Sequence, residues 1–265
     1  MKQNFILPNI ITAFGLSCGL FVIFRVSISS TESGLQVMLF NSVLLILLAA
    51  FADLLDGAIA RITNTESYFG SMFDALSDTV SFGVAPAVLF LKTLPLSIDP
   101  KFVFFGTIAA MLFTISGILR LVRFNVHTQE IKANRNDDGA FNKSFIGLPI
   151  PAAAIAVISL NLFLHSGPFG DKIFSSISVK YTTTSAFMII IGYLMISKYK
   201  FPSLKALHLK VPTLNMILLT VVVAIFVLYG ILYYFNTFLF VCSMGYIVVS
   251  SALNGIKKIA SIRAK

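Results

Sequence analysis

The sequence predicts an all-α protein, a polytopic membrane helix bundle with about eight transmembrane helices and a six-helix catalytic core. Hydrophobic residues make up 57% of the 265 positions and charged residues only 12%, a composition far too apolar for a soluble chain of this length. The apolar residues gather in runs close to the ~20 residues that a helix needs to cross a bilayer. No long polar segment remains that could form a soluble domain.

Each predicted span is an apolar run bounded by polar or turn-forming residues. In chain order the spans cover approximately residues 7–24, 36–60, 68–91, 102–121, 145–164, 182–196, 212–229 and 237–253. We expect one membrane domain over residues 1–265. Its catalytic core would occupy about residues 1–197, and residues 198–265 would add a transmembrane hairpin and a basic tail.

The connections support these limits in order along the chain. The first span follows a short polar segment at the N-terminus, as a signal peptide would. No small-residue cleavage site follows this span, so we expect a retained helix. The turn-rich segment SSTESG at 29–34 precedes the second span, and a short polar connection over 61–67 precedes the third. A longer polar loop, about 126–144, follows the fourth span. Prolines near the start of the fifth span are compatible with a helix N-terminus.

Basic residues are unevenly distributed between the two sides of this predicted bundle. With both chain ends inside, 15 of the 20 lysines and arginines fall in cytoplasmic segments. The positive-inside rule therefore favours an integral protein of the cell (inner) membrane with this orientation. The net charge of +9 is explained by these loops and by their attraction to anionic membrane lipid, so we expect no nucleic-acid partner.

Four aspartates lie at the cytoplasmic ends of the second and third spans. Asp53 and Asp56 are spaced i,i+3, and Asp74 and Asp78 are spaced i,i+4, so each pair faces one way on a helix. Carboxylates at membrane depth are costly unless they are paired, solvated or bound to a cation. Because Arg61 is the one nearby arginine in this stretch, structural ion pairs do not account for four acids.

Oxygen ligands of this kind suit hard divalent cations such as Mg²⁺ or Mn²⁺, and four acids can hold two of them. Two bound metals can stabilise the attacking and leaving oxygens of a phosphoryl displacement. Gly57 and Gly70 let a bulky group approach the backbone, although helix packing would explain either glycine as well. Arg61 adds a positive charge where a diphosphate would lie, or anchors the helix at the interface. Ser67 is equally suited to cap the third span.

Together these residues resemble the complete signature of the CDP-alcohol phosphatidyltransferases: Asp53-x2-Asp56-Gly57-x2-Ala60-Arg61-x8-Gly70-x3-Asp74-x3-Asp78. The resemblance implies that an alcohol hydroxyl attacks the phosphorus next to the lipid and that CMP leaves. It implies that all four aspartates bind the two metal ions, and that Asp78 is also the proton acceptor. The CDP-lipid would be held by Gly57, Ala60, Arg61, Ser67, Gly70, Asn9 and Thr12. Members of this family are often dimeric, so a homodimer is compatible with the resemblance.

Three further stretches resemble the phosphatidylserine synthase branch of this family: LPNIITAFGLSCG, SDTVSFGVAPA, and GILRLVRFNV followed by FIGLPIPAAA. This likeness implies an enzyme of phospholipid biosynthesis, a CDP-diacylglycerol–serine O-phosphatidyltransferase with CDP-diacylglycerol and L-serine as substrates. Arg120 and Arg123 lie three residues apart and can share a helix face, where either could pair with the serine carboxylate. Asn125 and Lys143 are further acceptor-binding candidates. The same arginines would also suit glycerol 3-phosphate or an inositol phosphate, and choline is another acceptor that the signature allows.

A metal-ion transporter is an alternative from a different functional class. A transport pathway predicts acids at mid-depth in several spans. In this sequence the acids cluster at one membrane face in two spans, with an arginine among them. That distribution favours the enzyme.

Overall fold

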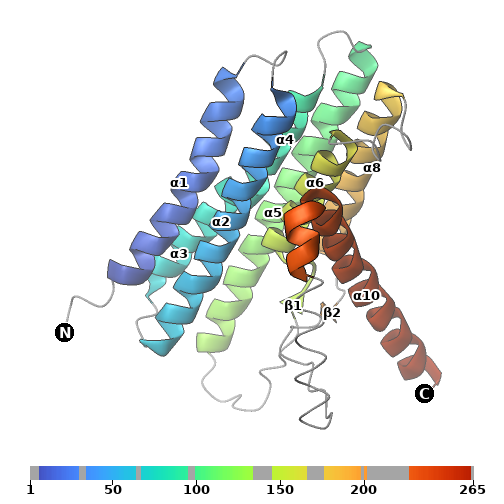
Figure 1. The fold of residues 1–265 in the computed structure, drawn as a ribbon. Helices are drawn as coiled ribbons and strands as arrows, with labels where there is room; N and C mark the ends of the chain where they lie inside the picture. Colours follow the sequence, from blue (N-terminus) through green and yellow to red (C-terminus); the bar gives the residue numbers. More distant parts are fainter. Residues whose placement is uncertain are drawn as a thin grey trace.

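The computed structural model describes residues 6–29, 34–63, 67–94, 99–133, 145–165, 176–197, 200–201 and 227–263, and these form an almost entirely helical bundle (Figure 1). In chain order the elements are α1 (Ile6–Ile28), α2 (Leu35–Ile62), α3 (Tyr68–Asp78), the π-helical segment η1 (Thr79–Val84), α4 (Ala85–Thr93), α5 (Pro100–Ala133), β1 (Phe145–Ile146), α6 (Ile150–His165), α8 (Ile177–Ile196), β2 (Lys200–Phe201) and α10 (Phe235–Arg263).

Six of the described helical stretches are long and apolar enough to cross a membrane: Leu7–Ile28, Leu35–Ala60, Tyr68–Thr93, Pro100–Val126, Ile177–Ile196 and Phe235–Ala252. The prediction of a polytopic helical membrane bundle is therefore confirmed. The predicted span at 145–164 corresponds to the shorter apolar helix α6. The predicted span at 212–229 lies outside the described residues except for 227–229, which are helical.

The fifth predicted span starts later than expected, at Ile150 instead of residue 145. Pro149 lacks a backbone N–H and disfavours helical geometry at the residue before it, so the helix begins after this proline. The preceding residues are extended. Phe145 and Ile146 pair antiparallel with β2, and the Leu148 N–H donates to Leu194 O at 3.2 Å. Gly147 has a φ of 86°, and a Cβ there would lie 2.2 Å from Met195 O, so this turn against α8 requires glycine.

The third span is continuous from α3 through η1 to α4, but it widens to a π-helix after Asp78. The Ala85 N–H donates to Val80 O, five residues back. Pro86 provides a physical reason, because it has no N–H to donate to the carbonyl four residues before it. Thr114 of α5 donates its hydroxyl to Gly83 O at 3.1 Å and so satisfies a carbonyl of the widened turn. Single π-turns of this kind are frequent at functional sites.

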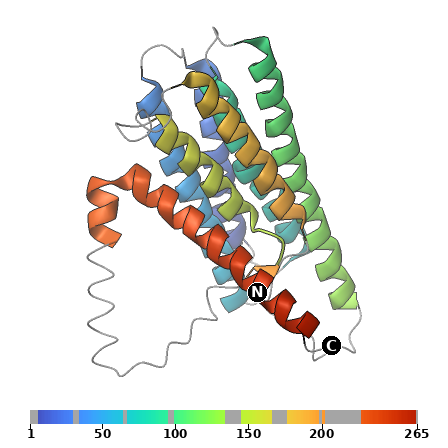
Figure 2. The ribbon, with the colours of Figure 1, turned by 90° about the vertical axis from the view of Figure 1, so that its right-hand side faces the viewer.

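Helix α6 lies inside the bundle and packs against α2, α4, α8 and α10. Helix α1 packs along α2 and against the third span, and α5 runs beside α8 (Figures 1 and 2). Phe82, Phe90 and Phe113 are among the largest fully buried side chains of this core. Helix α10 packs against α6 (Figure 2), where the Ser243 and Ser159 hydroxyls are 2.8 Å apart and Phe240 stacks on Phe163. On the other side of the bundle, α1 packs against both α2 and α3.

Candidate functional site

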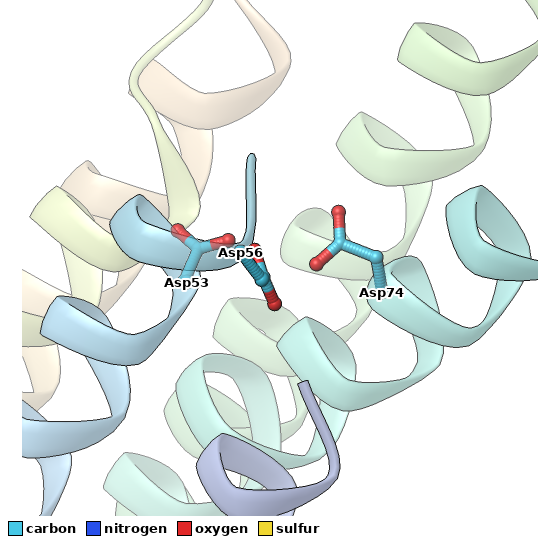
Figure 3. A group of neighbouring side chains, drawn as sticks. All are labelled: Asp53, Asp56 and Asp74. Atoms are coloured by element: carbon cyan, nitrogen blue, oxygen red, sulfur yellow. The ribbon is translucent and has the colours of Figure 1, made fainter. Parts of the chain in front are cut away.

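Three carboxylates from two helices converge near the C-terminal end of α2 (Figure 3). This end of α2 lies toward the end of the bundle at which α1 begins (Figure 1). Asp53 and Asp56 extend from α2 and Asp74 from α3, and one oxygen of each lies within 4.8 Å of the others. Asp56 is buried, and the other two are half-buried. Carboxylates this close repel one another unless a cation or a proton lies between them. Their oxygen-only donor set therefore suits a hard divalent cation.

Asp78 lies one helical turn after Asp74, at the last residue of α3. It lines the same small cavity as the three converging aspartates, together with Thr12, Gly15, Ser77 and Ser81. Its charge interacts with those of Asp53 and Asp74. The predicted fourth acid is thus on the cavity wall, although it is not one of the three whose oxygens converge.

Helix α1 forms one side of this cavity, and three hydroxyl groups connect it to α2, α3 and η1. The Thr12 hydroxyl lies 2.6 Å from Asp56 Oδ2. Ser77 of α3 donates to Thr12 O at 3.3 Å, and Ser81 of η1 donates to Gly15 O at 3.2 Å. Serines at i and i+4 thereby fasten the helical turn that carries Asp78 to the backbone of α1.

A positive charge faces the acids from α5. The guanidinium of Arg120 interacts electrostatically with Asp78 and Asp53, and its buried Nε has no hydrogen-bond partner among the described residues. Leaving a buried guanidinium N–H unpaired is costly. Tyr246 of α10 also interacts with Arg120. This arrangement can receive an anionic group beside the carboxylates.

The residues expected to hold a CDP group have contrasting surroundings. A Cβ atom on Gly57 would meet no atom of the described residues within 4 Å, so no described helix packs closely against this glycine. Ser67 accepts the Gly70 N–H at 2.9 Å, which confirms its geometry as the N-cap of α3. A Cβ on Gly70 would lie 3.2 Å from Asn9 Oδ1 and 3.0 Å from Ser67 Oγ. Asn9, Ser67 and Gly70 therefore gather at the α1–α3 junction.

The remaining predicted residues are less defined or have other partners. Ala60 is half-buried on α2, whereas the side chain of Arg61 and all of Lys143 lie outside the described residues. Arg123 is exposed, and its Nη2 donates to Ile196 O at the end of α8 at 2.9 Å. Asn125 is half-buried two residues further along α5. The structure thus gives the two arginines different partners: the acids for Arg120 and the end of α8 for Arg123.

Sequence reasoning missed Ser77, Ser81 and Tyr246. The two serines follow a visible signal, since they are spaced i,i+4 on either side of Asp78 in a very apolar span. Tyr246 had no such signal. It comes close to Arg120 only because α10 folds back over α6.

The chain is similar to known proteins over most of its length. The family model described as CDP-alcohol phosphatidyltransferase matches residues 5–242. A CDP-diacylglycerol–serine O-phosphatidyltransferase of Helicobacter pylori is 33% identical over 224 residues, which cover 82% of this chain and 81% of that protein. The protein of the same name in Bacillus subtilis is 31% identical over 212 residues, 77% of this chain and 93% of that one. An archaetidylserine synthase of Methanothermobacter thermautotrophicus is 35% identical over 161 residues, 60% of this chain and 57% of that one.

Proposed function

Because the chain belongs to the CDP-alcohol phosphatidyltransferase family, we propose that it transfers the phosphatidyl group of CDP-diacylglycerol to the hydroxyl of L-serine. The products are phosphatidylserine and CMP. The observation that carries this proposal is the convergence of Asp53, Asp56 and Asp74 within a complete family signature. The acceptor follows from the relatives, because the bacterial proteins are named for serine and the archaeal one for an archaetidylserine product.

The carboxylates fit the divalent metal that such a transfer uses. Asp53, Asp56, Asp74 and Asp78 would hold two Mg²⁺ or Mn²⁺ ions, since they line one cavity and offer only oxygen ligands. When bound, the metals supply neutralisation of charge on the phosphates and on the departing CMP. The open space beside Gly57 would admit the CDP group. Ala60, Arg61, Ser67, Gly70 and Asn9 would complete the walls around it.

Asp78 is the proposed proton acceptor. Its carboxylate would take the proton of the serine hydroxyl as the serine oxygen forms its bond to the phosphorus next to the lipid. The bond between that phosphorus and the CMP oxygen breaks in the same displacement, and CMP leaves with the bonding electrons. An aliphatic hydroxyl is a poor nucleophile unless a base takes its proton. Asp78 lines the same cavity as the converging acids, which supports this role.

Arg120 is the proposed partner of the serine carboxylate. It combines an unpaired buried Nε with charge interactions toward Asp78, the proposed base. A guanidinium can bind a carboxylate through two parallel hydrogen bonds. Serine held in this way would have its hydroxyl on the side of the base. Asn125 and Lys143 remain predicted acceptor contacts, whereas Arg123, which donates to Ile196 O at the end of α8, is not proposed to contact serine.

The proposed setting is the inner membrane, with the acids facing the cytoplasm. The last residues of α10 lie toward the same end of the bundle as the start of α1 (Figure 1), which supports the orientation that the basic residues favour. We propose the core at about residues 1–197 as the catalytic unit, with the segment from 198 onward as an addition to it. A homodimer stays a prediction from the resemblance.

The test is a transfer assay with purified protein in detergent. It contains CDP-diacylglycerol, Mn²⁺ or Mg²⁺, and in separate reactions serine, glycerol 3-phosphate, choline and an inositol phosphate. We expect phosphatidylserine and CMP with serine, and no product after chelation of the metal. Product with glycerol 3-phosphate but not with serine would contradict the acceptor, and CMP release without any metal would contradict the proposed metal-dependent chemistry.

A further inference from the structure

Thr12 lies in a position that differs from the one expected of a CDP contact. Its side chain is buried on α1, and its hydroxyl oxygen lies 2.6 Å from Asp56 Oδ2 and 3.0 Å from Pro8 O. A hydroxyl has one proton to donate. The helical pattern already gives Pro8 O a partner, the backbone N–H of Thr12. A hydrogen bond to a carboxylate is also the stronger of the two. The Thr12 hydroxyl therefore donates its hydrogen bond to Asp56.

The position of this hydroxyl is fixed by the backbone that carries it. Ser77 donates to the Thr12 carbonyl itself, and Ser81 donates to Gly15 O on the same helix. Helix α1 also approaches Ser81 closely at Gly19, where a Cβ atom would lie 2.9 Å or less from three atoms of Ser81. Helix α1 can therefore neither slide nor move away from α3 and η1 without losing these contacts. The hydroxyl is aimed at Asp56 before any ligand binds.

The hydrogen bond also limits how Asp56 can use its two oxygens. Oδ2 accepts from Thr12, and the carboxylate belongs to the group whose oxygens lie within 4.8 Å of Asp53 and Asp74. A carboxylate held at one oxygen cannot rotate freely about its Cβ–Cγ bond. The other oxygen is then kept available for a cation, as when hydrogen-bonded neighbours orient the ligands of metal sites.

We propose that Thr12 is a positioning residue that orients Asp56 as a metal ligand, and that it does not contact CDP. The proposal rests on the proposed metal-dependent function. It separates Thr12 from Asn9, which is near Gly70 at the α1–α3 junction. The two were expected to serve the same group.

The experiment is a titration of purified protein with Mn²⁺ in detergent, without CDP-diacylglycerol, in which the electron paramagnetic resonance signal of free Mn²⁺ is measured. We expect T12V to bind Mn²⁺ about 10- to 100-fold more weakly than wild type, as for other residues that orient metal ligands. T12S keeps the hydroxyl and should bind like wild type. S17A is the matched control on α1, because the Ser17 hydroxyl donates to Ala13 O of its own helix on an exposed face.

Thermal unfolding without metal shows whether each variant is folded, and if T12V does not fold, T12A removes the same hydroxyl with less bulk. Unchanged Mn²⁺ affinity in the folded variant, with a raised KM for CDP-diacylglycerol, would overturn the inference and make Thr12 a CDP contact. Equal loss in T12S and T12V would also overturn it, since the hydroxyl would not matter. A wild-type protein that binds no Mn²⁺ contradicts the metal-dependent function and this inference together. Of these three contrary outcomes, the first two overturn the role of Thr12 but leave the proposed function intact.

Discussion

Gly19 of α1 and Ser81 of η1 lie so close that a Cβ atom at residue 19 would be 2.4 Å from Ser81 Oγ and 2.7 Å from Ser81 Cα. The second distance involves backbone, so rotation of a side chain cannot relieve it. Ser81 lies three residues after Asp78 and lines the acid cavity. The absence of a side chain at residue 19 therefore sets the distance between α1 and the segment that carries the proposed base.

Replacing Gly19 by alanine should destabilise the fold and disturb the site. The added methyl group must push α1 away from η1, and overpacking of this kind typically costs about 1–3 kcal/mol. We expect a lower melting temperature in detergent, measured at a fixed scan rate, together with lower transferase activity. G245A is the control, since a Cβ on that glycine of α10 would meet no described atom within 4 Å. A G19A protein with wild-type melting and activity would contradict the close contact.

Gly57 should respond in the opposite way. No described atom lies within 4 Å of a Cβ at this position, and alanine favours a helix over glycine by about 1 kcal/mol. The G57A variant should therefore melt at the same temperature as wild type or higher. Its activity should nevertheless fall, by on the order of 10²-fold if the methyl group displaces the reacting phosphate by about 1 Å. Retained activity with an unchanged KM for CDP-diacylglycerol would mean that the donor does not use this space.

The acid site was largely predictable because its information is local. Two helical pairs of aspartates in an apolar chain already require a cation or another compensating charge. The spacing of the signature then indicates transfer of a phosphatidyl group. The structure brings Asp53, Asp56 and Asp74 together as the pattern predicts. The N-cap of Ser67 was likewise visible three residues before Gly70, which donates to it.

Other features depend on tertiary packing that no local pattern contains. The partner of Thr12 became clear only when α1 was placed beside α2, and Arg123 has its partner at the end of α8. The delayed start of α6 was partly readable from Pro149, but the pairing of β1 with β2 was not. The π-turn after Asp78 follows from Pro86 together with contacts from α1 and α5, and those contacts required the fold.

Asp78 should be essential for turnover but not for donor binding. Asparagine has nearly the same shape and cannot accept the proton of serine, and a positioned base typically contributes about 10²–10⁴-fold to the rate. We expect D78N to lose this factor in kcat, measured as labelled phosphatidylserine formed, while it still binds CDP-diacylglycerol. D99N makes the same chemical change at the start of α5, toward the opposite end of the bundle, where Asp99 Oδ1 accepts the Lys101 N–H at 2.9 Å (Figure 1). Activity in D78N equal to that of D99N would exclude Asp78 as the base.

Arg120 should determine the affinity for serine. Its buried Nε lacks a partner among the described residues, and a hydrogen bond to a charged group contributes about 1.5–3 kcal/mol. Glutamine at this position removes the positive charge, so the KM for serine in R120Q should rise by about 10- to 100-fold, with a smaller change in the KM for CDP-diacylglycerol. Ethanolamine has the hydroxyl and the amine of serine but no carboxylate. The preference for serine over ethanolamine should therefore narrow in the variant.

The matched control for this prediction is R123Q, three residues along the same helix. Arg123 is exposed and donates to Ile196 O, so its loss should lower the melting temperature by weakening the end of α8 while the KM for serine stays close to wild type. The two variants test which arginine binds the serine carboxylate. The sequence did not distinguish Arg120 from Arg123, because at helical spacing both could reach it. A raised KM for serine in R123Q, with R120Q unaffected, would assign the acceptor carboxylate to Arg123. Arg120 would then serve only to balance the charge of Asp78 and Asp53.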